Sequence, residues 1–291
     1  MTEISVASRS IARMLQGYSI ELHPGDEKVL KLAQERLDPE TEVFLTWIPG
    51  TAPRDMIAAA GKLRRSGLIP VPHVGARHLE SASQLEQMAA RLAGEAGVDR
   101  ILIVGGDRPK PAGPYDSSLS VMQTEAFQKA GILRIAVAGF PEGNPHIAEA
   151  VLDEALEAKV SFARNSGLQL SIVTQFCFRP EPILGWLRRL CARGIAVPVR
   201  VGLAGPAGPL TLARYAMRCG IGNSLHVLTE NSSFAKLLIE KGPEPIIQGL
   251  AASTEDGKAA LPSGVTGLHF FVFGGFTKSV DWINAQRTQA Q

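Results

Sequence analysis

The feature that most constrains the fold is a regular alternation of short apolar segments with longer helical segments. The clearest apolar segment covers residues 101–104 (Ile-Leu-Ile-Val) and runs directly into Gly105, Gly106 and Asp107. An unbroken apolar run of this length is typical of a strand buried on both faces, as in a parallel sheet. Seven further segments resemble strands, so the predicted strands cover residues 18–22, 43–47, 68–73, 101–104, 134–139, 170–175, 197–202 and 268–273.

Helical segments follow these strands. The predicted helices cover residues 27–36, 54–66 and 82–94, a segment ending near 129, then 148–164, 181–192, 209–219, 233–241 and 245–252, and a last segment ending near 285. Eight strand–helix units without a linker predict an α/β fold, a single-domain (β/α)8 TIM barrel over residues 1–291, with a short helix over 1–16. The alternative is an open doubly wound sheet, which normally carries Gly-x-Gly-x-x-Gly after its first strand. Residues 19–25 contain no such motif.

Composition argues against several classes of protein. The chain is 45% hydrophobic and 20% charged, which predicts a substantial core and little disorder. The formal net charge of +2, without a basic tract, argues against nucleic-acid binding. No stretch has the length of a membrane span without charges. The sequence does not decide the oligomeric state, and a homo-oligomer stays open.

The cysteines and the first residues of the chain bear on location and on metal binding. Cys177, Cys191 and Cys219 lack the spacing of a metal site, and the first residues show no apolar signal core. We therefore expect reduced, buried thiols, no metal and a cytoplasmic location.

Polar residues cluster where the predicted strands end. In a (β/α)8 barrel the carboxyl ends of all strands meet at one rim, where ligands bind. The predicted rim carries Glu21, His23, Thr46, His73, Asp107, residues 140–144, Thr174, Gln175, Gly202 and residues 270–275. Carboxylates, imidazoles and an amide in an apolar setting predict a small-molecule site.

Glu21 is the most informative of these residues because it lies within a strand, between Ile20 and Leu22. A barrel strand has no solvent face, so we expect this carboxyl group to be desolvated, to have a raised pKa, and to serve as a general acid. The alternative is a structural glutamate paired with a buried cation. Gln175 offers a donor and an acceptor that suit the edge of a heterocycle, or it makes an ordinary strand-end hydrogen bond.

Several motifs, in this order along the chain, resemble those of the methylenetetrahydrofolate reductase family. They are Ser-Ile-Glu-Leu-His-Pro at 19–24, a strand ending in Thr at 43–47, Pro-His at 72–73, Gly-Asp-Arg-Pro at 106–109, Ala-Gly-Phe-Pro-Glu-Gly at 138–143, Ile-Val-Thr-Gln-Phe-Cys-Phe at 172–178 and His-Phe-Phe at 269–271. Each motif is weak alone, but seven in register over nearly the whole chain are specific.

The resemblance implies a (β/α)8 barrel that reduces 5,10-methylenetetrahydrofolate to 5-methyltetrahydrofolate. In the family, flavin adenine dinucleotide (FAD) carries hydride from NADH or NADPH to the folate. By position, Glu21 would be the catalytic acid that protonates a folate nitrogen, Asp107 would bind the pterin and tune the redox centre, and Gln175 with Phe176 would bind the substrate. The residues implied on the cofactor side are Thr46, His73, Gly106, Phe140, Glu142 and Lys159.

The chain departs from the family pattern mainly on the flavin side. Gly105 stands where the family has Arg, Asn144 where it has His, and Phe140 where it has Tyr. The family's Leu-Lys-x-Lys pattern is reduced to Leu-Glu-Ala-Lys at 156–159. We therefore expect FAD to be weakly held or absent, with hydride passing directly from the nicotinamide to folate. The alternative function is a folate-binding or methyl-transfer partner that has lost flavin redox chemistry.

Overall fold

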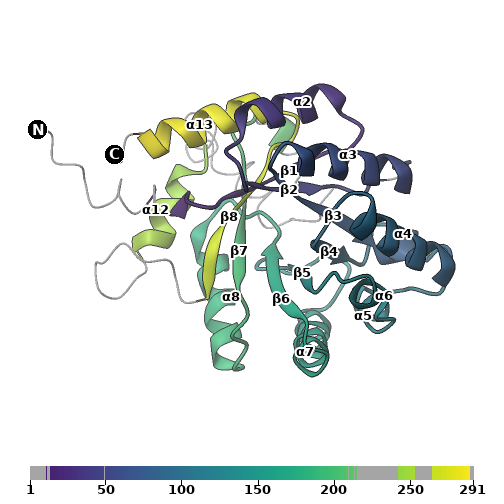
Figure 1. The fold of residues 1–291 in the computed structure, drawn as a ribbon. Coiled ribbons are helices and arrows are strands. Elements are labelled where there is room, and N and C mark those ends of the chain that lie inside the picture. Colours follow the sequence, from purple (N-terminus) through teal and green to yellow (C-terminus); the bar gives the residue numbers. More distant parts are fainter. Residues whose placement is uncertain are drawn as a thin grey trace, which may run out of the picture. The chain divides into compact units, whose positions relative to one another are not determined.

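The structure, a computed structural model, describes residues 11, 14–48, 50–208, 210–212, 214, 242–252 and 264–288. Its eight strands form a closed barrel in the order of the chain, β1 to β8, with helices between them (Figure 1). The strand pairs β2–β3, β3–β4, β4–β5 and β7–β8 are all parallel. The predicted (β/α)8 barrel is therefore confirmed, while the single-domain organisation stays a prediction.

The bounds of the elements are close to those expected. The strands are β1 (Ser19–Leu22), β2 (Glu42–Leu45), β3 (Ile69–Gly75), β4 (Arg100–Val104), β5 (Arg134–Gly139), β6 (Gln169–Thr174), β7 (Val199–Ala204) and β8 (Val265–Phe271). The helices are α2 (Glu27–Arg36), α3 (Pro53–Arg65), η1 (Ala76–His78), α4 (Ala82–Gly94), α5 (Ser118–Met122), α6 (Ala126–Lys129), α7 (Glu149–Asn165), α8 (Pro180–Ala192), α12 (Glu244–Ala252) and α13 (Phe276–Thr288).

The chain divides into two compact units. The Glu21 unit comprises Ile20–Ala138 and Asp153–Ile172. The Gln175 unit comprises Met1–Ser19, Gly139–Leu152 and Val173–Gln291. Each unit is described below by itself.

In the Glu21 unit, β4 is buried on both faces, as its unbroken apolar sequence predicts. Ile101 and Ile103 are fully buried, and Leu102 is 5% exposed. Helices α2, α3 and α4 follow one another along the outside of this part of the sheet (Figure 1). Each covers the strands with one apolar face, which includes Leu30 in α2 and Leu63 in α3.

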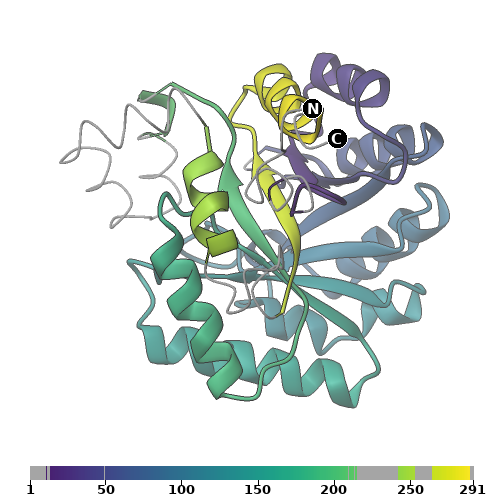
Figure 2. The ribbon, with the colours of Figure 1, turned by 90° about the vertical axis from the view of Figure 1, so that its left-hand side faces the viewer.

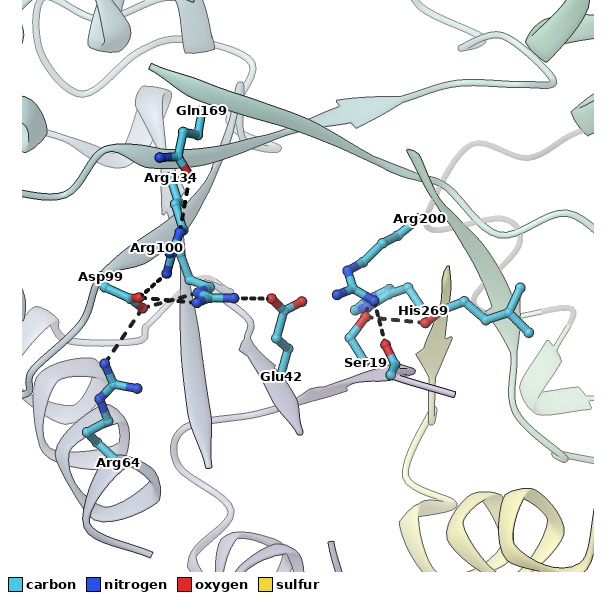
Figure 3. Close-up of polar contacts among 11 residues, drawn as sticks. Ser19, Glu42, Arg64, Asp99, Arg100, Arg134, Gln169, Arg200 and His269 are labelled. Carbon is cyan, nitrogen blue, oxygen red and sulfur yellow. Dashed lines mark hydrogen bonds and ion pairs between the residues drawn. The ribbon is translucent and has the colours of Figure 1, made fainter. Parts of the chain in front are cut away.

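Charged residues connect the amino-terminal ends of several strands in the Glu21 unit (Figure 3). The Arg100 guanidinium donates to Asp99 over 3.1 Å and also to Glu42 at the start of β2. Asp99 also accepts from Arg134 at the start of β5, over 2.6 Å, and lies 3.8 Å from Arg64 of α3. Catalytic groups of a (β/α)8 barrel lie at the opposite, carboxyl-terminal end of the strands, so polar groups at this end serve stability. We refer to these five residues, Glu42, Arg64, Asp99, Arg100 and Arg134, as the structural clamp.

In the Gln175 unit, β7 and β8 lie side by side and α12 packs on α8 (Figure 2). The helices meet closely at Gly249, where an added Cβ would lie 2.5 Å from Pro180. Ser19 Oγ lies 2.9 Å from His269 Nδ1, and both residues are fully buried (Figure 3).

One predicted helix differs from the structure, and other predicted helices fall on residues that the structure does not describe. The single helix expected to end near 129 is divided into α5 and α6 because Glu125 has a left-handed backbone (φ 58°), which interrupts the helical hydrogen bonds. The predicted helix at 233–241, and most of those at 1–16 and 209–219, lie outside the described residues. No helix in the described part of the chain is long and apolar enough to cross a membrane.

Candidate functional site

Glu21 occupies a mostly buried position in β1. Its neighbours Ile20 and Leu22 are 0% and 2% exposed, and its own side chain is 19% exposed. Burial raises the pKa of the Glu21 carboxyl above its ordinary value, while the nearby His73 acts in the opposite direction. The carboxyl is therefore desolvated, as its place within a strand predicts.

His73 of β3 lies close to Glu21. Its Nε2 atom lies 3.6 Å from Glu21 Oε2. Its ring also meets the ring of Phe44 edge to face, with centroids 6.0 Å apart. The imidazole thus belongs to the immediate surroundings of the carboxyl, and its predicted role toward a flavin stays a prediction.

Asp107, just beyond β4, is held by a histidine that the sequence analysis did not single out. His78 Nε2 lies 2.8 Å from Asp107 Oδ1. The His78 side chain is only 8% exposed, whereas that of Asp107 is 59% exposed. Trp47, which follows β2, stacks on the His78 ring with centroids 6.0 Å apart and planes 26° apart.

Two glycines leave room for the His78 ring. A Cβ added to Gly75 would lie 2.8 Å from His78 Cδ2, and one added to Gly106 would lie 3.0 Å from the same atom. Gly106 also has a φ of 94°, a conformation that side-chain-bearing residues rarely adopt. His78 therefore helps to explain Gly106, a contact that the pattern of the sequence does not reveal, whereas a Cβ added to Gly105 would meet nothing within 4 Å.

Arg77, beside His78 in η1, fixes the long loop that follows Asp107. Its guanidinium donates to the backbone carbonyls of Asp116, Arg108 and Pro109 over 2.9 to 3.2 Å. The η1 segment thus anchors both Asp107 and the loop behind it.

Two more polar residues of the predicted site, Thr46 after β2 and His23 after β1, lie where these strands end. The Thr46 hydroxyl donates to the carbonyl of Leu22 over 3.3 Å, so it links the ends of β2 and β1. His23 Nδ1 accepts a hydrogen bond from the Gly25 backbone over 3.0 Å, which leaves the ring proton on Nε2 in the neutral form. His23 Nε2 is buried and has no hydrogen-bond partner.

In the Gln175 unit, Gln175 is fixed at the end of β6. Its backbone N–H donates to Gly139 over 2.8 Å, and its side-chain oxygen accepts from the Phe176 backbone over 3.3 Å. The neighbouring Thr174 hydroxyl accepts from the Gly202 backbone over 2.8 Å. Gly202 is required here, because a Cβ would lie 2.2 Å from the Thr174 carbonyl oxygen.

Phe176 lies in an aromatic cluster in the same unit. Its side chain is fully buried and contacts the rings of Phe178, Phe271 and Phe273 at centroid distances of 5.0 to 5.6 Å. Phe273 has a left-handed backbone with φ 47°, which is uncommon for a bulky residue. Phe176 supports this cluster, and its direct contact with a substrate stays a prediction.

Three of the residues expected on the flavin side, Glu142, Phe140 and Lys159, have different environments. Glu142 interacts with the Cys177 thiol, and burial together with Glu142 raises the pKa of that thiol well above its ordinary value. Phe140 accepts through its carbonyl from Gly143 in a tight turn. In the Glu21 unit, burial lowers the pKa of Lys159. Cys177 is a buried core thiol, as predicted. Cys191 is exposed, so the expectation of a buried thiol is wrong at that position, and Cys219 lies outside the described residues.

The structure thus brings together two pairs in the Glu21 unit, Glu21 with His73 and Asp107 with His78. Gln175 belongs to the other unit, so its convergence with these pairs stays a prediction. Among the described residues, no group of three or more His, Cys, Asp or Glu side chains could hold a metal ion.

Solved structures resemble this chain at low sequence identity. An uncharacterised protein from Clostridium thermocellum that binds two copies of 5-methyl-5,6,7,8-tetrahydrofolic acid matches with a TM-score of 0.59 and 13% identity, over 98% of this chain and 99% of that chain. A xylose isomerase domain protein from Planctomyces limnophilus matches with a TM-score of 0.44 and 13% identity, over 94% and 97%. At this identity the first likeness shows the fold alone.

The sequence itself gives a more specific result. The profile of the family described as methylenetetrahydrofolate reductase matches residues 27–274, which is most of the chain. The matched region contains His73, His78, Asp107 and Gln175. The chain belongs to the methylenetetrahydrofolate reductase family.

Proposed function

We propose that this protein interconverts 5,10-methylenetetrahydrofolate and 5-methyltetrahydrofolate, with NADH or NADPH as electron donor or NAD(P)⁺ as acceptor. The observation that carries the proposal is the desolvated Glu21 carboxyl within β1, opposite His73. Family membership supports a reaction of this kind. The Clostridium thermocellum protein, which binds 5-methyltetrahydrofolic acid, supports a folate ligand for a barrel of this fold.

Glu21 would supply the proton that the reduction needs. Opening the five-membered ring of methylenetetrahydrofolate breaks a bond between the methylene carbon and the N10 nitrogen, which must gain a proton. The methylene carbon then accepts hydride from the nicotinamide and becomes the methyl group. Because burial raises its pKa, Glu21 holds a proton at a higher pH than an exposed glutamate would. In the oxidative direction the same carboxylate would take the proton back.

Asp107 and Gln175 would bind the pterin ring. A carboxylate accepts from the ring's N–H groups, and an amide can both donate and accept along the ring edge. Asp107 is more than half exposed, and one of its oxygens is already held by His78. The backbone and the side chain of Gln175 are both fixed by hydrogen bonds. Both residues therefore offer positioned polar groups at strand ends.

The residues present fit the phosphate side of a flavin dinucleotide poorly. Gly105, Asn144 and Glu157 occupy positions where the family carries cationic or imidazole side chains. Arg77, which lies beside Gly105 through a backbone hydrogen bond, uses its guanidinium on loop carbonyls. Burial disfavours the charged form of Lys159. We therefore propose that FAD is weakly held or absent and that hydride passes directly between nicotinamide and folate.

The test is an assay of NADH and NADPH oxidation with methylenetetrahydrofolate, run with and without added FAD, on freshly purified protein whose absorption spectrum is recorded first. We expect turnover without a flavin band and little stimulation by FAD. Stoichiometric, tightly bound flavin would contradict direct hydride transfer. Absence of turnover with either nucleotide, with and without FAD, would contradict the proposed reaction.

A second function stays open because the departures are concentrated on the flavin side. A folate-binding or methyl-transfer partner would keep the pterin-binding residues and lose redox chemistry. Such a protein would bind 5-methyltetrahydrofolate in a titration and show no nicotinamide-dependent turnover under any of the conditions above. The same experiment therefore separates the two functions.

A further inference from the structure

We propose that His78 is a positioning residue for Asp107, holding its carboxylate so that the other oxygen can accept a hydrogen bond from an N–H group of the folate. The inference rests on the proposed function, since it names how that site orients its ligand. His78 comes from η1, 29 positions before Asp107, and it is not part of the motifs that suggested the family.

The exposed fractions of the two side chains indicate which residue orients the other. His78 is 8% exposed and Asp107 is 59% exposed. In a catalytic His–Asp pair the aspartate is buried and orients a histidine that faces the substrate. Here the order is reversed, so the buried histidine orients an accessible carboxylate.

The His78 ring is itself rigidly placed. Trp47 stacks on one side of it. A Cβ added to Gly75 would lie 2.8 Å from His78 Cδ2, and one added to Gly106 would lie 3.0 Å from the same atom. A ring confined in this way has few rotamers, so its Nε2 atom has a defined position. An ionised carboxylate only accepts hydrogen bonds, so Nε2 must carry the proton that is donated to Oδ1.

This arrangement fixes the plane of the Asp107 carboxylate before a ligand arrives. With Oδ1 engaged by His78, Oδ2 is the oxygen left to accept from a ligand. The N–H groups on the pyrimidine ring of a pterin are donors of the required kind. A carboxylate that is already oriented loses less side-chain freedom on binding, which increases affinity.

A double-mutant cycle tests the inference, with binding of 5-methyltetrahydrofolate measured by calorimetric titration of the full chain. His78→Phe keeps an aromatic ring against Trp47 and removes the donor, whereas His78→Gln places an amide N–H near the position of Nε2. We expect His78→Phe to weaken binding roughly tenfold, which corresponds to about 1.4 kcal/mol. We expect His78→Gln to recover most of that loss.

The decisive comparison is made in the Asp107→Ala background. If His78 acts through Asp107, His78→Phe should change affinity less than about twofold once the carboxylate is gone. Equal losses in both backgrounds, or an unchanged affinity of His78→Phe, would overturn the inference while leaving the proposed function standing. Wild-type protein that binds neither 5-methyltetrahydrofolate nor methylenetetrahydrofolate would overturn the proposed function and, with it, this inference.

Discussion

Glu21 Oε2 lies 3.6 Å from His73 Nε2 in a mostly buried setting. The distance is longer than a direct hydrogen bond, so the imidazole does not hold the carboxyl as a close ion pair would. Burial is the stronger influence and raises the pKa of Glu21, and His73 only reduces the shift. A carboxyl within a strand, with its pKa raised by burial, is thus the central chemical feature of the Glu21 unit.

Replacing Glu21 by Gln should stabilise the fold in a pH-dependent way. Because the folded protein disfavours the charged carboxyl, the wild type loses stability as the pH rises from the ordinary value of 4.5 through the raised folded pKa. Below 4.5 both folded and unfolded carboxyls are protonated, so the two proteins should be nearly equally stable. Urea unfolding at several pH values measures the difference in free energy, which should grow with pH and then level off.

The control for this comparison is Glu35→Gln, which removes a carboxylate from an exposed position on α2. A pH-independent difference between wild type and Glu21→Gln would show that the Glu21 carboxyl has an ordinary pKa.

Removing the charge of Asp99 should weaken the structural clamp without affecting turnover. Burial alone would raise the pKa of Asp99, but the hydrogen bonds and charge of Arg100, with Arg64 and Arg134, lower it overall. Its stabilising contribution is therefore present above about the ordinary value of 3.8 and is lost as the pH falls through the lower, folded pKa. Because the side chain is about one-third exposed, we expect Asp99→Asn to cost only about 1 kcal/mol at neutral pH.

Asp55→Asn provides the matched control, because Asp55 forms an exposed ion pair with Arg54 on α3. Its loss should cost less than about 0.5 kcal/mol. Equal costs for the two variants, or a large loss of kcat in Asp99→Asn, would contradict a purely structural clamp.

Gly75→Ala should be destabilising because of His78. The new Cβ would lie 2.8 Å from His78 Cδ2, so the ring or the backbone must move, at a cost of about 1–3 kcal/mol. In a His78→Ala background the ring is absent and most of this cost should disappear. Thermal unfolding of the four proteins measures the coupling. Gly94→Ala, where nothing lies within 4 Å, is the control and should be neutral or slightly stabilising.

His23→Phe should stabilise the fold. Nε2 of His23 is buried without a partner, and an unsatisfied buried donor costs about 1–3 kcal/mol. Replacing the imidazole by an apolar ring removes that cost, while the exposed Gly25 N–H that it releases can bond to water. Thr51→Val is a parallel case, since Thr51 Oγ1 is also buried without a partner. A lower unfolding temperature for both variants would contradict this account.

The sequence predicted the fold well where local pattern and burial agree. The unbroken apolar run of β4 predicts a strand buried on both faces. The succession of eight strand–helix units predicts the closed barrel. The split between α5 and α6 could not be predicted, because a glutamate does not by itself favour the left-handed backbone that Glu125 adopts.

The candidate site was predictable only in part, for a similar reason. Glu21 stands out because a charged residue inside an apolar strand is costly wherever it is buried. His78 gave no such signal, since its importance depends on Trp47 and Asp107, which the fold brings around it from distant parts of the sequence. Contacts between loops of this kind carry no periodicity in the sequence.

The most direct test of the central claim compares Glu21→Gln with wild type in nicotinamide-dependent reduction of methylenetetrahydrofolate, with folate affinity measured on the same preparations. Gln keeps the size and polarity of the side chain but cannot donate an acidic proton. The account predicts that Glu21→Gln binds folate within a few-fold of wild type and loses kcat by roughly 100-fold or more. A variant that binds folate and turns over at the wild-type rate would contradict it.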